Sequence, residues 1–169
     1  MKSLIKEING KSPQFGENCY ISENATIIGD VKCGKHCSFW FNSVTRGDVH
    51  FIKIGNEVNI QDGAIIHCTY KKSPTTIGNQ VTIGHNAIVH GCTIKDRVLI
   101  GMGSIVLDNC IIESDSVIAA GAVVTMGTRV KSGEIYAGVP AKKVKDGAFK
   151  KQLLDLANKY VEYSKWYKD

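Results

Sequence analysis

The 169-residue sequence lacks several features that mark whole classes of protein. No stretch comes near the roughly 18 apolar residues in a row that indicate a membrane-spanning helix, and residues 1–15 contain no apolar run of signal-peptide length. The net charge is +5, but the basic residues are scattered and form no stripe interleaved with aromatic side chains. We therefore expect a cytoplasmic protein with neither a membrane nor a nucleic acid as partner.

Cysteine pairs of the CxxC type are also missing. The six cysteines are Cys19, Cys33, Cys37, Cys68, Cys92 and Cys110. Because nothing in the sequence indicates export to an oxidising compartment, we expect these residues to be reduced thiols.

A strict internal repeat of six residues is the strongest feature that the sequence does have. Isoleucine or valine occupies thirteen positions in three series: Ile54, Ile60 and Ile66; Ile77, Ile83 and Val89; Ile94, Ile100, Val106, Ile112, Ile118, Val124 and Val130. Mostly small residues stand two positions before them: Ala64, Thr75, Ala87, Cys92, Ser104, Cys110, Ser116, Ala122 and Thr128. A period of six fits short strands separated by tight turns and does not fit a helix of period 3.6.

This period predicts an all-β solenoid, a left-handed parallel β-helix with three strands and about 18 residues per coil. Each isoleucine or valine should point into the axis of a triangular prism. The small residues, Cys92 and Cys110 among them, should fill the corners. Glycine follows four of the repeat positions, and we expect these glycines to allow the sharp turns: Gly55, Gly78, Gly84 and Gly101.

The two ends of the chain depart from the repeat. We expect a lead-in strand and cap over residues 1–24 and the β-helix over residues 25–141. Apolar residues then recur at spacings of three and four, which is typical of an amphipathic helix. We therefore expect a C-terminal α-helix within residues 142–169 that packs on the β-helix.

Two histidines fall in the same register. His67 follows Ile66 and His90 follows Val89, a gap of one coil plus five residues, and the spacing from Ile66 to Ile77 shows where the extra residues form a loop. With that loop removed, the two histidines occupy the same position on successive coils. Neighbouring strands lie about 4.8 Å apart, so both rings can reach one metal ion through bonds of about 2.0–2.1 Å.

A third histidine, His85, stands two residues after Ile83, on the preceding face. Its side chain should project around a corner, away from His67 and His90. It can join them only if a second subunit supplies it. Three histidines and an open position are the layout of a catalytic zinc site. A single histidine on a β-helix is usually only a surface residue, but two in register with a third nearby are much harder to explain by chance.

Three segments resemble the γ-class carbonic anhydrase family. They are residues 46–48 (RGD), residues 59–63 (NIQDG) with His67, and residues 84–92 (GHNAIVHGC). The resemblance implies a homotrimer with Zn²⁺, or alternatively Fe²⁺ or Co²⁺, bound at each interface by His67 and His90 of one subunit and His85 of the next. It also implies reversible hydration of CO2 to bicarbonate by a metal-bound hydroxide.

The same resemblance assigns roles to other polar residues. Arg46 matches an arginine that pairs with a carboxylate across the trimer interface, and Asp48 and Asp62 are the matching carboxylates. An ion pair that only sets assembly explains these residues equally well.

Three further residues match positions near the reaction. Gln61 matches a glutamine beside the metal-bound water, and Asn59 lies on the same stretch. Tyr160 resembles a tyrosine of the C-terminal helix that approaches the site, although packing of the helix on the prism would also account for it.

One departure and two alternatives bear on the reaction. The best-characterised branch of the family has a long acidic loop with a proton-transferring glutamate, whereas residues 70–74 (YKKSP) contain no acid. Another residue or a buffer would have to take the proton.

A fold alone does not select a function, so alternatives remain. Hexapeptide β-helices also serve as acyltransferases with a histidine base, or as acyl-CoA thioesterases. A non-catalytic metal-binding trimer is a third interpretation.

Overall fold

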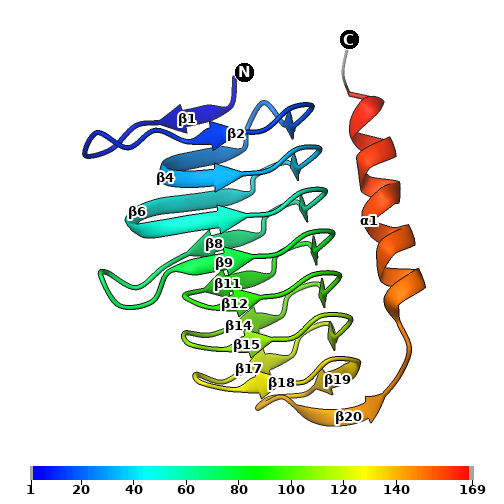
Figure 1. Ribbon diagram of the computed structural model, residues 1–169. Helices are drawn as coiled ribbons and strands as arrows, with labels where there is room; N and C mark the ends of the chain where they lie inside the picture. The colour runs from blue at the N-terminus through cyan, green and yellow to red at the C-terminus, as the bar shows by residue number, and fades with distance from the viewer. Residues whose placement is uncertain (1, 168–169) are drawn as a thin grey trace.

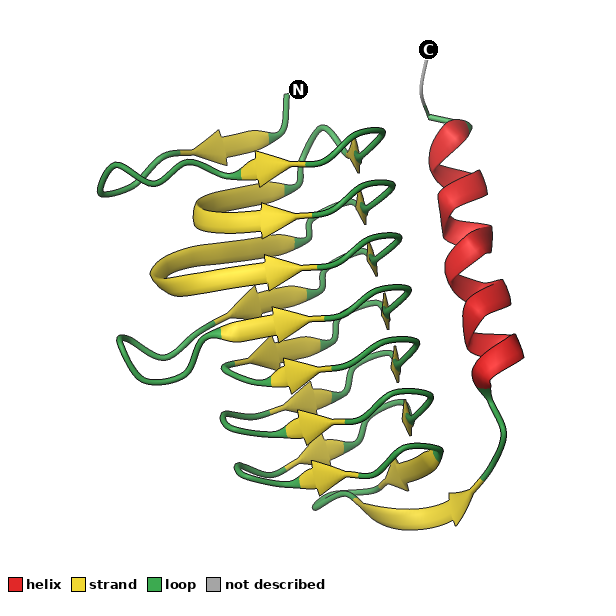
Figure 2. Cartoon of the chain, in the orientation of Figure 1, coloured by secondary structure: helices red, strands yellow, loops and turns green. Residues whose placement is uncertain are grey.

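The segments that carry the six-residue repeat form short parallel strands, which stack in three faces around one axis (Figures 1 and 2). The computed structural model describes residues 2–167, and it is a left-handed parallel β-helix with a single C-terminal helix among those residues. The first face contains β8 (Ile65–His67), β11 (Ile88–His90), β14 (Ile105–Val106) and β17 (Val123–Val124). The second contains β9 (Thr75–Ile77), β12 (Thr93–Ile94), β15 (Ile111–Ile112) and β18 (Arg129–Val130).

The third face and the first coils complete the prism. The third face contains β3 (Tyr20–Ile21), β5 (Ser38–Phe39), β7 (Asn59–Ile60), β10 (Thr82–Ile83), β13 (Leu99–Ile100) and β16 (Val117–Ile118). Two long strands, β4 (Thr26–Cys33) and β6 (Val44–Ile54), run through both of the other faces and pair with each other. The lead-in strands β1 (Leu4–Lys6) and β2 (Gln14–Phe15) pair with β4, so parallel pairing already begins within residues 1–24.

The predicted core is confirmed. All thirteen repeat isoleucines and valines are buried, none more than 5% exposed. Ile60, Ile83, Ile100 and Ile118 are successive partners in one ladder, so each stacks on its equivalent in the next coil. Burying one such side chain contributes about 1.5–3 kcal/mol. Cys92 and Cys110 are buried corner residues, as expected.

The four glycines that follow repeat positions were expected to allow sharp turns, and this explanation was wrong. None of Gly55, Gly78, Gly84 and Gly101 has a positive φ. They permit close approach of coils instead, because a Cβ on Gly101 would lie 2.5 Å from the backbone nitrogen of Ala120. The sharp turns use a residue with positive φ, which comes directly before the small corner residue of each coil. In one column of turns these residues are Gly63 (φ 68°), Asn86 (φ 56°), Gly103 (φ 65°) and Gly121 (φ 68°).

The C-terminal end differs from the expected helix boundary. The third face continues into β19 (Glu134–Ala137), and residues 142–146, which were expected to lie in the helical segment, form β20 (Lys142–Asp146), antiparallel to β19. The helix α1 (Lys150–Lys165) then runs back along the prism and contacts β5, β7 and β10 (Figure 1). Residues 1, 168 and 169 of the expected cap and helical segments lie outside the described residues.

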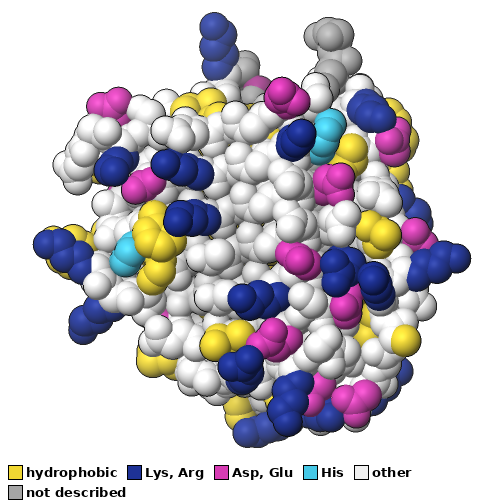
Figure 3. Space-filling model, viewed as in Figure 1, with side chains coloured by type: hydrophobic (Ala, Val, Ile, Leu, Met, Phe, Trp, Pro, Cys, Tyr) yellow, Lys and Arg dark blue, Asp and Glu magenta, His cyan; other side chains and the backbone are white. Residues whose placement is uncertain are grey.

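The surface of the prism carries mixed charge. On the face seen in Figure 3, Lys and Arg side chains are interspersed with Asp and Glu over the coils. Within residues 2–167, no helix is both long and apolar enough to cross a membrane.

Candidate metal centre

The first face brings two histidines together as the register argument predicted. His67 ends β8, His90 ends β11, and the two are backbone partners in the parallel ladder. The extra residues form a loop closed by a bridge between Thr69 and Ser73, which confirms that the insertion is extruded from the prism.

The two imidazole rings are separated by a distance that suits a shared ion. Nδ1 of His67 lies 3.1 Å from Nε2 of His90. Two nitrogens on a tetrahedral ion with bonds of about 2.0–2.1 Å lie about 3.3 Å apart. The separation of the two nitrogens is therefore close to that of two ligands on one divalent cation.

Carboxylates hold the other ring nitrogens. Asp48 lies 3.1 Å from Nε2 of His67, and Asp108 lies 2.6 Å from Nδ1 of His90. With each carboxylate accepting the N–H beside it, both lone pairs face the gap between the rings. Burial lowers the pKa of His67, which favours the neutral ring that metal binding requires. In metalloproteins, carboxylates commonly accept the N–H of metal-binding histidines in the same way.

Asp108 is a site residue that the sequence reasoning missed. It accepts a hydrogen bond from Thr69, so it also fixes the loop after His67. Burial opposes ionisation, but the hydrogen bonds from Thr69 and His90 lower the pKa of Asp108 below its usual range. The sequence does indicate that Asp108 lies beside His90, because it follows His90 by 18 residues, about one coil.

Arg46 and Asp48 form a pair inside one chain. Nη1 of Arg46 donates to the Asp48 carboxylate at 2.5 Å. This bond and the one from His67 lower the pKa of Asp48, although burial alone would raise it. Asp62 is paired elsewhere, with Nδ1 of His85 at 2.8 Å. The expected bond of Arg46 across a subunit interface stays a prediction.

His85 lies apart from the other two histidines, in the turn after β10 on the third face. It lines a cavity together with Gln61 and Tyr160, and neither His67 nor His90 lines that cavity. Within the described part of one chain, the three histidines do not meet as a group of ligands. The chain therefore carries two candidate half-sites, one on each of two faces.

Buried amides form a short network beside His85. Asn59 and Gln61 are buried, and the Gln61 side-chain amide donates to the Asn59 oxygen at 3.0 Å. Asn59 donates in turn to Thr82 at 2.9 Å, a partner that the sequence reasoning did not name. Gln61 also lines the cavity beside His85.

The cavity beside His85 has a volume of about 330 Å³. Its apolar lining includes Leu99, Met102, Val117 and Leu156. Tyr160 of α1 closes one side and packs against Trp40 with ring centroids 5.7 Å apart. Burial raises the pKa of Tyr160, which keeps its hydroxyl protonated. Tyr160 thus both packs the helix on the prism and borders the half-site.

The stacked coils and the paired histidines define a class, that of hexapeptide-repeat β-helix proteins with a candidate metal centre. A sequence model of the family described as "Bacterial transferase hexapeptide (six repeats)" matches residues 91–125. A solved structure titled as a hexapeptide transferase family protein from Anaplasma phagocytophilum superimposes with a TM-score of 0.92 at 41% identity, covering 97% of this chain and 98% of the other.

Two curated relatives indicate to which family within this class the chain belongs. The Carbonic anhydrase of Geobacillus kaustophilus is 38% identical over 98% of this chain and 91% of its own length. Gamma carbonic anhydrase 2, mitochondrial, of Arabidopsis thaliana is 40% identical over 95% of this chain, which spans 57% of that relative's length. The chain belongs to the γ-carbonic anhydrase-like family of hexapeptide-repeat proteins.

Proposed function

We propose that this protein catalyses the reversible hydration of CO2 to bicarbonate as a homotrimer with a metal centre at each subunit interface. The ion is Zn²⁺, with Fe²⁺ and Co²⁺ as alternatives, held by His67, His90 and His85 of the partner subunit. The observation that carries the proposal is the facing pair of imidazole nitrogens, 3.1 Å apart and each backed by a carboxylate.

Assembly of two different half-sites explains why one chain is incomplete. A cyclic trimer brings one surface of a subunit against a different surface of the next. The side chains of Arg46, Asp62 and His85 are 41%, 42% and 40% exposed in the single chain, so each is available to a neighbour. In the trimer, His85 completes the ligand set, and Arg46 meets Asp62 of the partner subunit.

The residues around the centre have distinct tasks. A bound divalent cation lowers the pKa of a coordinated water toward 7 and so supplies a nucleophile at neutral pH. Asp48 and Asp108 fix the histidine rings and their tautomers. Gln61, oriented by Asn59, presents its carbonyl oxygen to the reacting groups, and the apolar wall of the cavity receives CO2.

The proton that CO2 hydration releases passes to the solvent in this proposal. The loop after His67 presents Lys71 and Lys72 and no carboxylate, so it offers no acceptor for the proton that hydration releases. We propose that buffer molecules take that proton at the open side of the site.

The apolar cavity also favours a second candidate function. A volume of about 330 Å³ exceeds what CO2 needs and suits a short acyl group beside His85. An acyltransferase or an acyl-CoA thioesterase would use that histidine as a general base. This candidate leaves the carboxylate-backed pair His67 and His90 without a task, which is why we rank it second.

Kinetics on metal-replete protein test the proposal. We expect CO2 hydration in stopped-flow assays, with kcat rising with the concentration of an imidazole buffer and kcat/KM nearly constant, because proton transfer follows the CO2 step. Acyl-CoA should neither turn over nor inhibit. Turnover of acyl-CoA without CO2 hydration at any buffer concentration would establish the second candidate, and inactivity toward both would leave a metal-binding trimer.

A further inference from the structure

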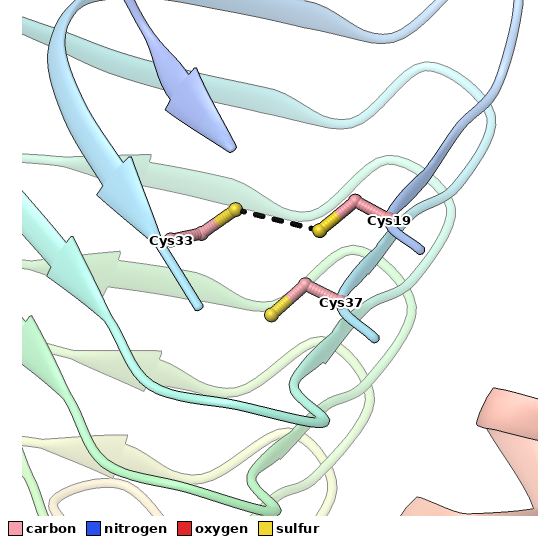
Figure 4. A group of neighbouring side chains, drawn as sticks. All are labelled: Cys19, Cys33 and Cys37. Carbon is pink, nitrogen blue, oxygen red and sulfur yellow. Dashed lines mark hydrogen bonds between the residues drawn. The ribbon is translucent and has the colours of Figure 1, made fainter. Parts of the chain in front are cut away.

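Three cysteines in the first coils bring their sulfurs close together, and those of Cys19 and Cys33 face each other (Figure 4). Cys33 ends β4, whereas Cys19 and Cys37 come directly before β3 and β5 on the third face. The three Sγ atoms all lie within 4.8 Å of one another, and those of Cys19 and Cys33 are 3.8 Å apart. Cys37 is fully buried, and the other two are partly buried. Among the residues that the structure describes, no other group of three potential ligands meets in this way.

The prism does not need sulfur at these positions. Cys33 is the ladder partner of Ile54, so it takes the place of an inward isoleucine. Cys19 and Cys37 stand two residues before the inward residues of β3 and β5. The next coils of the same face have Val58, Val81 and Val98 at this position, followed by Ser116. In two neighbouring columns, positions that are branched aliphatic in the next three coils are thus cysteine in the first coils.

We propose that Cys19, Cys33 and Cys37 form a binding site for one thiophilic d¹⁰ cation, Zn²⁺ or Cu⁺, separate from the histidine centre. Thiolates select these soft cations over Mg²⁺ or Ca²⁺. Two sulfurs on a tetrahedral zinc with bonds of about 2.3 Å lie about 3.8 Å apart, which is the observed spacing of Cys19 and Cys33. The remaining sulfur, on Cys37, has to move by about 1 Å or less to complete the set.

The surroundings of the sulfurs suit a site that exchanges protons for a cation. Cys19 donates to the Gly34 carbonyl at 3.2 Å and Cys37 donates to the Gly55 carbonyl at 3.1 Å, so backbone oxygens hold the thiol protons in the absence of metal. Hydrogen bonds among the thiols, together with burial, raise the pKa of Cys33 and Cys37. Binding therefore releases protons and strengthens as the pH rises.

A bound cation would have a structural consequence. It would join β3, β4 and β5 at the end of the prism where β1 and β2 begin the fold. The site would stabilise the first coils, which contain the irregular part of the repeat.

Metal stoichiometry of the reduced full-length protein tests the site. Protein is equilibrated without oxygen with Zn²⁺, or in a second arm with Cu⁺, in the presence of a competing chelator, and bound metal is measured by elemental analysis. We expect Cys19→Ser and Cys37→Ser each to bind one cation fewer per chain than the unmodified protein, and the arm in which this loss appears identifies the cation. Zn²⁺ or Cu⁺ should raise the melting temperature of the unmodified protein more than that of Cys19→Ser.

Cys110→Ser is the matched control, because serine already fills equivalent buried corners at Ser104 and Ser116. It should bind as many cations as the unmodified protein. Cys19 is only partly buried, so Cys19→Ser keeps the test valid if Cys37→Ser does not fold. Unchanged stoichiometry of both cations in folded Cys19→Ser would overturn the proposal and leave the three cysteines as packing residues beside Phe15 and Phe39.

Discussion

At the scale of single residues, the candidate centre is a column of polar groups along one corner of the prism. Asp48, His67, His90 and Asp108 follow one another through coils of the first face, each within 3.1 Å of the next. The two carboxylates lie at the ends and the two facing nitrogens in the middle. The protein therefore fixes both rings before any ion binds.

Replacing the carboxylate behind His90 tests this arrangement. Asp108→Asn should weaken metal affinity roughly 10–100-fold, because the ring loses the partner that sets its tautomer and orientation. Competition with a chelator measures the change. The control is Asp115→Asn, which removes a carboxylate bound to Arg97 away from the site and should leave the affinity unchanged. Equal losses in the two variants would show that Asp108 acts only through general stability.

At the scale of elements, the repeat made the coils predictable but did not determine the structure of the chain ends or of the corners. Every coil buries an isoleucine or valine at a fixed interval, so pattern alone located the core and the register of His67 and His90. β20 has no such pattern, because all five of its residues are exposed and it forms by pairing with β19. The glycines and the role of Asp108 depend on contacts between coils, which periodicity does not describe.

Stacking of the inward side chains should dominate the stability of the coils. Ile100→Ala removes a fully buried side chain in the middle of the third face and should lower the free energy of unfolding by about 2–5 kcal/mol. The same change at Ile5, which is 46% exposed in β1, should cost no more than about 0.5 kcal/mol. Denaturant titration of the two variants compares them. Similar losses would mean that the ladder of isoleucines is not what holds the coils together.

At the scale of the whole molecule, the proposed function requires a second copy of the chain. The first-face half-site offers two ligands and an open side, and the third-face half-site offers His85, Gln61 and a cavity. Neither half can bind a three-histidine ion alone. A head-to-tail trimer has three equivalent interfaces, so we expect one ion per chain.

The most direct test of this split is metal content in mixed trimers formed by co-expressing two variants. His85→Ala and His90→Ala should each lose most metal alone. Mixed in equal amounts they should recover about a quarter of the unmodified content, because that fraction of interfaces joins an intact pair to an intact His85. His67→Ala mixed with His90→Ala should recover none, since both changes affect the same half-site. Recovery in neither mixture, or equal recovery in both, would contradict a centre shared between subunits.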